Sequence, residues 1–121
     1  MKRYLLLSAL FILGMATPLR AQVLEGTYAV EGVNSEGTPY TGTAILDKYG
    51  QGVYILKWTF TGGRNAEGYG IIQHGVLAVV IKNSEGGISL ATYIVEPTGV
   101  LIGLWLSPPS TAVFTEALTP R

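Results

Sequence analysis

The segment Val76–Leu106 reads VLAVVIK-NSEGG-ISLATYIVE-PTG-VLIGLWL and decides the fold. Its three longer runs are rich in Val, Ile, Leu and Thr, and β-branched residues suit a pleated strand. The two connectors between them carry Gly, Pro, Asn and Ser, the residues of tight turns. A parallel crossover needs about a dozen residues or more, so connectors this short force neighbouring strands to be antiparallel. The segment therefore predicts a three-stranded antiparallel meander.

The same pattern extends in both directions and predicts an all-β chain. Gly and Pro recur too often after residue 22 for several helices of the usual ~11–12 residues. The last run is the least secure, because Ser110 could instead cap a short helix. Eight sequential strands favour an antiparallel up-and-down barrel, closed to remove its edges. The expected strands are Gly26–Val33, Tyr40–Lys48, Val53–Thr61, Gly68–Gln73, Val76–Lys82, Ile88–Glu96, Val100–Leu106 and Ala112–Leu118.

An internal repeat supports a barrel built from two four-strand halves. Ala29-Val30-x-x-x-Asn34-Ser35-Glu36-Gly37 recurs 49 positions later as Ala78-Val79-x-x-x-Asn83-Ser84-Glu85-Gly86. Two further matches follow downstream, the second of which pairs Gly52–Trp58 with Gly99–Trp105. Each half lacks a partner for its apolar face when alone, so the two halves are expected to close on each other.

Lys57 assigns the inner and outer faces. Side chains alternate along a strand, and lysine almost never faces a dry core, so Trp58 points inward. The repeat then places Trp105 inward as well. Inward rings favour a filled interior, although an eight-stranded barrel can also hold one small ligand. If a cavity exists, its expected ligand-binding residues are Tyr28, Tyr54, Trp58, Tyr93 and Trp105.

The outer face of the second half is unusually apolar. Soluble monomers seldom expose a contiguous apolar patch beyond a few hundred Å². The patch predicts self-association or docking on a protein partner, unless residues 107–121 cover it. Strands of a membrane barrel need ~9–11 residues and aromatic girdles, and the shorter strands with inward rings argue against membrane insertion. The expected interface residues are Val80, Leu90, Ile94, Ile102, Leu104 and Leu106.

The first 21 residues have the features of a secretory signal. Positive Lys2-Arg3 precedes an uncharged apolar stretch, and cleavage after Ala21 would leave 22–121 as a single β-barrel domain. The apolar stretch is too short for a membrane-spanning helix, which needs ~20 residues. Removing Lys2, Arg3 and Arg20 changes the net charge from zero to −3. We therefore expect an exported protein, periplasmic or extracellular.

Composition and motifs argue against catalysis, metal binding and nucleic-acid binding. The chain has no cysteine and one histidine, His74, which is expected to be a surface turn residue. Glu36 and Glu85 are explained by turn geometry, and the loop around Arg64 lacks the lysine and the spacing of a phosphate loop. No basic excess points to nucleic acid. We expect no cofactor, no metal and no enzyme activity.

The overall pattern resembles a set of small exported bacterial all-β proteins of unassigned function. The residues that carry the resemblance are Gly26-Thr27-Tyr28, Tyr40-Thr41-Gly42, Tyr54–Trp58, Gly68–Ile71, Gly75–Val79, Tyr93 and Gly99–Trp105. The plan is also similar to avidin and lipocalin barrels, without the polar residues of a biotin pocket. Gly37-Thr38-Pro39-Tyr40 is similar to part of a loop in bacterial lysozyme-inhibitor barrels. The serine that precedes the glycine in that loop is missing here.

These observations lead to three functional hypotheses. The first is an exported, non-catalytic interaction module that dimerises or docks on a partner through the outer apolar patch. The second is a calycin-like carrier that holds a small apolar ligand inside the barrel. The third is an inhibitor of a secreted hydrolase such as lysozyme.

Overall fold

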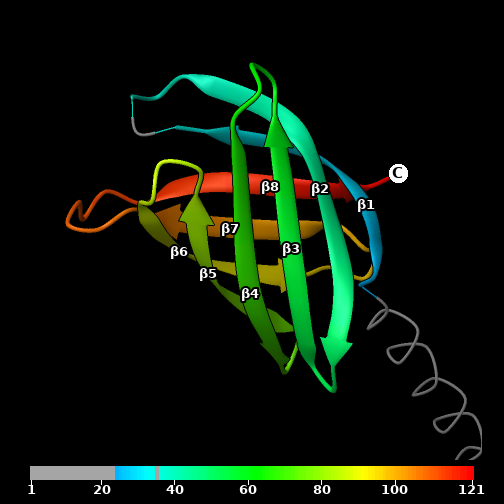
Figure 1. Ribbon diagram of the computed structural model, residues 1–121. Coiled ribbons are helices and arrows are strands. Elements are labelled where there is room, and N and C mark those ends of the chain that lie inside the picture. Colours follow the sequence, from blue (N-terminus) through cyan, green and yellow to red (C-terminus); the bar gives the residue numbers. More distant parts are fainter. Residues whose placement is uncertain (1–23, 35) are drawn as a thin grey trace, which may run out of the picture.

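A closed barrel of eight antiparallel strands forms the whole described part of the chain (Figure 1). The computed structural model describes residues 24–34 and 36–121. The predicted signal peptide, residues 1–21, therefore lies outside the described residues. Within the described ranges, no helix has the length and apolar character needed to cross a membrane. The strands are β1 Gly26–Val33, β2 Pro39–Gly50, β3 Val53–Phe60, β4 Asn65–Gln73, β5 Val76–Asn83, β6 Ile88–Val95, β7 Leu101–Leu106 and β8 Phe114–Pro120.

The connectivity is the meander that the short connectors predict, and the closing strand is β8. Each strand pairs with the next, and β8 pairs antiparallel with both β7 and β1. In Figure 1, β3 and β4 run in front while β7 and β8 cross behind them at a steep angle, as the tilt of strands in a small barrel requires. The predicted all-β, eight-stranded up-and-down barrel is confirmed.

Every strand except β1 differs from its predicted bounds by one to three residues at one end or both, and β8 and β4 are the instructive cases. The residues around Ser110 are not helical, and β8 begins at Phe114 rather than Ala112. Strand β4 begins at Asn65 rather than Gly68, because Thr61–Arg64 make a tight turn closed by the backbone N–H of Phe60 on the Arg64 carbonyl. Glycine at position 68 weakens the strand pattern, but it is required there: a Cβ would lie 2.8 Å from Val79 Cγ1.

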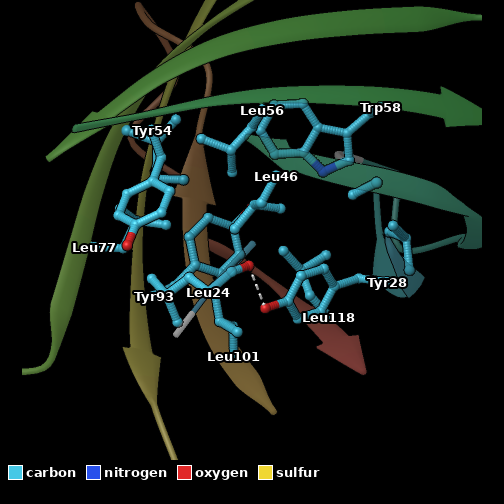
Figure 2. Packing of buried hydrophobic residues seen from close by; sticks show 14 residues of the cluster. Leu24, Tyr28, Leu46, Tyr54, Leu56, Trp58, Leu77, Tyr93, Leu101 and Leu118 are labelled. Atoms are coloured by element: carbon cyan, nitrogen blue, oxygen red, sulfur yellow. Dashed lines mark hydrogen bonds between the residues drawn. The ribbon is translucent and has the colours of Figure 1, made fainter. Parts of the chain in front are cut away.

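The inward side chains follow the predicted alternation and fill one end of the barrel. Leu46, Leu56, Leu77, Leu101 and Leu118 are fully buried there (Figure 2). Leu24, just before β1, closes this end, and its carbonyl accepts a 2.7 Å hydrogen bond from the Tyr28 hydroxyl. The rings of Tyr54 and Trp58 complete the same cluster. The core therefore occupies the end of the barrel at which β1 begins.

The two copies of the repeated turn have the same geometry. The side-chain oxygen of Asn34 accepts from the backbone N–H of Glu36 and Thr38. The Asn83 oxygen accepts in the same way from Glu85 and Gly87. These side-chain hydrogen bonds explain why asparagine begins both turns. In the meander, both turns lie at the end of the barrel opposite Leu24.

Candidate functional site

A cavity of about 570 Å³ occupies the end of the barrel opposite Leu24. We call this end the mouth; it is rimmed by the turns β1–β2, β3–β4, β5–β6 and β7–β8. The walls are mainly aromatic, with several amide and hydroxyl groups and one guanidinium near the rim. The lining residues are Asn34, Tyr40, Trp58, Phe60, Thr61, Gly62, Arg64, Ala66, Ile81, Asn83, Ser89, Tyr93, Trp105, Ser107 and Glu116.

Glu116 is the buried acid of this cavity, with 6% of its surface exposed. Its Oε2 accepts hydrogen bonds from the Tyr93 hydroxyl at 2.6 Å and from Trp58 Nε1 at 3.1 Å. Its Oε1 accepts from the Tyr40 hydroxyl at 2.5 Å. Three neutral donors, from β2, β3 and β6, thus converge on one carboxyl group of β8.

Two glycines make this convergence possible. Gly32 on β1 and Gly103 on β7 are the cross-strand partners of Glu116. The same glycines pair on their other sides with Tyr40 and Tyr93, respectively. A Cβ at Gly32 would lie 2.4 Å from the Tyr40 ring, and one at Gly103 would lie 2.5 Å from the Tyr93 ring. Each tyrosine ring therefore lies over a glycine, which allows its hydroxyl to reach the acid two strands away.

Burial sets the electrostatics of the site. Desolvation raises the pKa of Glu116 above its ordinary value, and the hydrogen bonds from Tyr40, Tyr93 and Trp58 act in the opposite direction. Desolvation, together with the negative charge of Glu116, also raises the pKa of Tyr40 and that of Tyr93. Both tyrosines are therefore neutral hydrogen-bond donors at physiological pH.

The five predicted ligand-binding residues divide between the two ends of the barrel. Trp58, Tyr93 and Trp105 line the mouth cavity, and all three come from different strands. Tyr28 and Tyr54 are buried in the apolar core and do not line the cavity. The expectation of a filled interior is therefore correct for the Leu24 end and wrong for the mouth. The cavity exists because residues between the rings there are small: Ala66, Ser89 and Ser107.

Sequence reasoning missed Glu116, the residue on which the site depends. Alternation along the last strand offered a signal, because Glu116 shares its face with Leu118 and Phe114. The short, late strand gave too little apolar periodicity to show that this face was the inner one. Gly32 and Gly103, each opposite a tyrosine, were the other available signal.

The predicted interface residues form an outward patch, with one exception. Val80, Leu90, Ile94, Ile102 and Leu104 are 42–60% exposed, whereas Leu106 is partly buried. Cross-strand pairing makes the patch continuous, since Val80 pairs with Leu90 and Ile94 pairs with Ile102. Tyr69 and Ile71 of β4 are also exposed and extend it, with Tyr69 opposite Val80. Residues 107–121 leave these five side chains exposed, and β8 within that segment is itself a strand of the barrel wall.

His74 and a hollow on the outer surface are weaker candidates for a functional site. His74 is exposed in a two-residue turn with Gly75, both at positive φ, as expected for a surface turn residue. A hollow of about 670 Å³ lies against β3–β5 and is lined largely by exposed side chains such as Lys57, Glu67 and Tyr69. The mouth cavity, with its buried acid, is the stronger candidate site.

Comparison with known proteins establishes the fold. No family model matches the chain, and no curated protein matches it. A redesigned β-barrel superposes with a TM-score of 0.73 at 16% identity, over 84% of this chain and 94% of the other. The redesigned barrel mFAP1, solved bound to DFHBI, gives 0.68 at 16% identity over 84% and 97%. A de novo designed fluorescence-activating barrel gives 0.62 at 19% identity over 84% and 96%. The expected barrel plan fits these structures, while the resemblance to exported bacterial proteins stays a prediction.

Proposed function

We propose that this protein binds a small molecule in the mouth cavity and is a carrier or sensor rather than an enzyme. The observation that carries the proposal is the cavity itself: about 570 Å³ of space walled by aromatic rings, with a buried acid at its wall. Ligand pockets commonly measure ~300–1,000 Å³ and combine apolar walls with a few converging polar groups.

Two further observations support a ligand that combines an apolar body with hydrogen-bonding groups. Among the described residues, Trp105 Nε1 is the one buried side-chain nitrogen or oxygen without a hydrogen-bond partner. A buried donor left unpaired costs ~1–3 kcal/mol, and an acceptor atom on a ligand would satisfy it once the Trp105 ring shifts to expose the nitrogen. In addition, the structurally similar barrel mFAP1 holds DFHBI.

Native mass spectrometry of freshly purified protein tests the proposal. We expect a co-purifying small molecule, which disappears in Ala66→Phe because the new ring fills the cavity. Ala78→Phe adds the same ring to the exposed outer face of β5 and should retain the ligand. Equal retention by both variants, or a cavity that binds no small apolar probe in solution, would refute the proposal.

The outer apolar patch supports a second function, self-association with another copy of the chain. The patch spans neighbouring strands β4–β7, and its rows are apolar except for Thr92. Two copies can therefore bury the patch against each other without leaving a charge unpaired. Solution mass provides the test, with Leu104→Lys and Ile94→Lys converting a dimer to a monomer. Thr27→Lys, on the exposed part of β1, is the matched control. A strictly monomeric wild-type protein would rule this function out.

Export remains part of the proposed function on sequence grounds. The features of residues 1–21 support it. N-terminal sequencing of the protein from its natural host should begin at Gln22, and an intact Met1 would contradict export. The inhibitor hypothesis gains no support, because Tyr40 of the suggested loop turns its hydroxyl inward to Glu116.

A further inference from the structure

The carboxyl group of Glu116 is buried next to open space without a positive partner. Among residues 24–34 and 36–121, the only ion pair joins Lys57 and Glu67, both on the surface. The three hydrogen-bond partners of Glu116 are all uncharged. Buried charges in proteins are normally paired, since removing a carboxylate from water costs several kcal/mol. No positive side chain among the described residues forms an ion pair with this acid.

The surroundings are nevertheless built to hold the charged form. Trp58 Nε1 is a donor only, and both tyrosine hydroxyls are placed to donate, so all three groups match an ionised carboxylate. Ionised, the two oxygens can accept about four hydrogen bonds, and three are made. One acceptor position on Oε1 is left. Burial opposes the charge while the donors favour it, and a cation in the cavity would resolve this conflict.

The cavity walls are also suited to a cation. Five aromatic side chains line the same space as Glu116, and a cation is attracted to the faces of such rings. The attraction is strongest where water is excluded, as in a cavity walled by rings. The aromatic residues are Tyr40, Trp58, Phe60, Tyr93 and Trp105.

We infer that the ligand of the mouth cavity is an organic cation, an ammonium group on an apolar body, placed with its charge against Glu116 and its body among the aromatic rings. This inference rests on the proposed small-molecule function and specifies its ligand class. Arg64 at the rim is the nearby positive group that lines the cavity, and it acts against cation entry.

Two probes of the same shape isolate the role of charge. Phenyltrimethylammonium and tert-butylbenzene differ in a single atom, nitrogen against carbon, and therefore in charge. Both tryptophans of the chain line the cavity, so intrinsic fluorescence and the two indole N–H signals in NMR report binding without a label. We expect the cation to bind roughly tenfold or more tightly than its uncharged isostere.

Variants identify the responsible group. In Glu116→Gln, the preference for the cation should disappear, whereas Glu31→Gln on the exposed face of β1 removes the same charge and should keep it. Arg64→Ala gives an independent check that does not alter the buried network, and we expect it to tighten cation binding about two- to fivefold. If Glu116→Gln fails to fold, Arg64→Ala and the comparison of the two probes on the wild-type protein still test whether the cavity prefers a cation.

The outcomes separate the two proposals. Equal binding of both probes overturns the cation inference and leaves the small-molecule function standing. Tighter binding of the uncharged probe also overturns it. Binding of neither probe, together with the absence of a co-purifying molecule, overturns both.

Discussion

Gly103→Ala tests the arrangement that positions the acid. A Cβ at this position would lie 2.5 Å from both Cδ1 and Cε1 of Tyr93, whereas carbon atoms pack at ~3.5–4.0 Å. The ring must therefore withdraw by about 1 Å, although Tyr93 is only 1% exposed and is packed in the buried hydrophobic cluster. Overpacking of this kind costs ~1–3 kcal/mol. Moving the ring also weakens the 2.6 Å bond to Glu116, and hydrogen bonds to charged groups contribute ~1.5–3 kcal/mol.

Alanine offsets ~0.4–1 kcal/mol of these costs by restricting the unfolded chain. The expected net loss in the free energy of unfolding is about 2–4 kcal/mol. Urea unfolding followed by tryptophan fluorescence measures it, with an unchanged m-value. Gly50→Ala is the matched control, since its Cβ would meet nothing closer than 3.8 Å. In a Tyr93→Leu background the cost of Gly103→Ala should shrink. If Gly103→Ala and Gly50→Ala unfold at the same urea concentration, the close approach of ring and glycine is refuted.

Three further predictions concern the acid, the turns and the cavity. Burial raises the pKa of Glu116, so the folded state binds the proton of this carboxyl group more tightly than the unfolded chain does. The free energy of unfolding should therefore fall as pH rises from ~4.3 through the folded pKa. Urea midpoints across this range should show the slope in wild type and lose it in Glu116→Gln; an identical slope in both would contradict the assignment. Asn83→Ala removes two hydrogen bonds to the β5–β6 turn and should cost ~1 kcal/mol in the same assay, whereas Ser84→Ala should be near neutral. Equal costs would show that the asparagine side chain does not hold the turn. Phenyltrimethylammonium should bind more weakly as pH falls and Glu116 is protonated. The other groups that face this acid do not titrate in that pH range; they are Tyr40, Trp58 and Tyr93. An affinity that calorimetry shows to be independent of pH would contradict this prediction.

The fold could be predicted because its determinants are local. Short Gly- and Asn-containing connectors impose antiparallel neighbours, and the alternation around Lys57 and Trp58 separates the inner face from the outer one. The repeat extended this assignment to Trp105. The turn and alternation signals each lie within a few residues along the chain, and the repeat is visible in the sequence itself, so no knowledge of the closed barrel was needed.

The site could not be predicted because it is made by residues far apart in sequence. Tyr40 and Glu116 are separated by 76 positions, and their contact depends on the closing pair between β1 and β8. Closure of the first strand on the last could be predicted, but no local signal fixes the register that places Glu116 beside Gly32. The size of the cavity likewise depends on small lining residues from different strands, such as Ala66 of β4 and Ser89 of β6. The inward tryptophans could be found, but the acid that they surround could not.

A cation bound against Glu116 must change the ionisation of this acid. The carboxyl ¹³C signal of Glu116 can be followed by NMR against pH, with and without saturating phenyltrimethylammonium. We expect a midpoint above the ordinary glutamate range in the free protein and a shift of the midpoint to lower pH on binding. By linkage, a tenfold preference of the cation for the ionised acid corresponds to a downward shift of about one pKa unit. A midpoint that does not move when the cation binds would contradict the account.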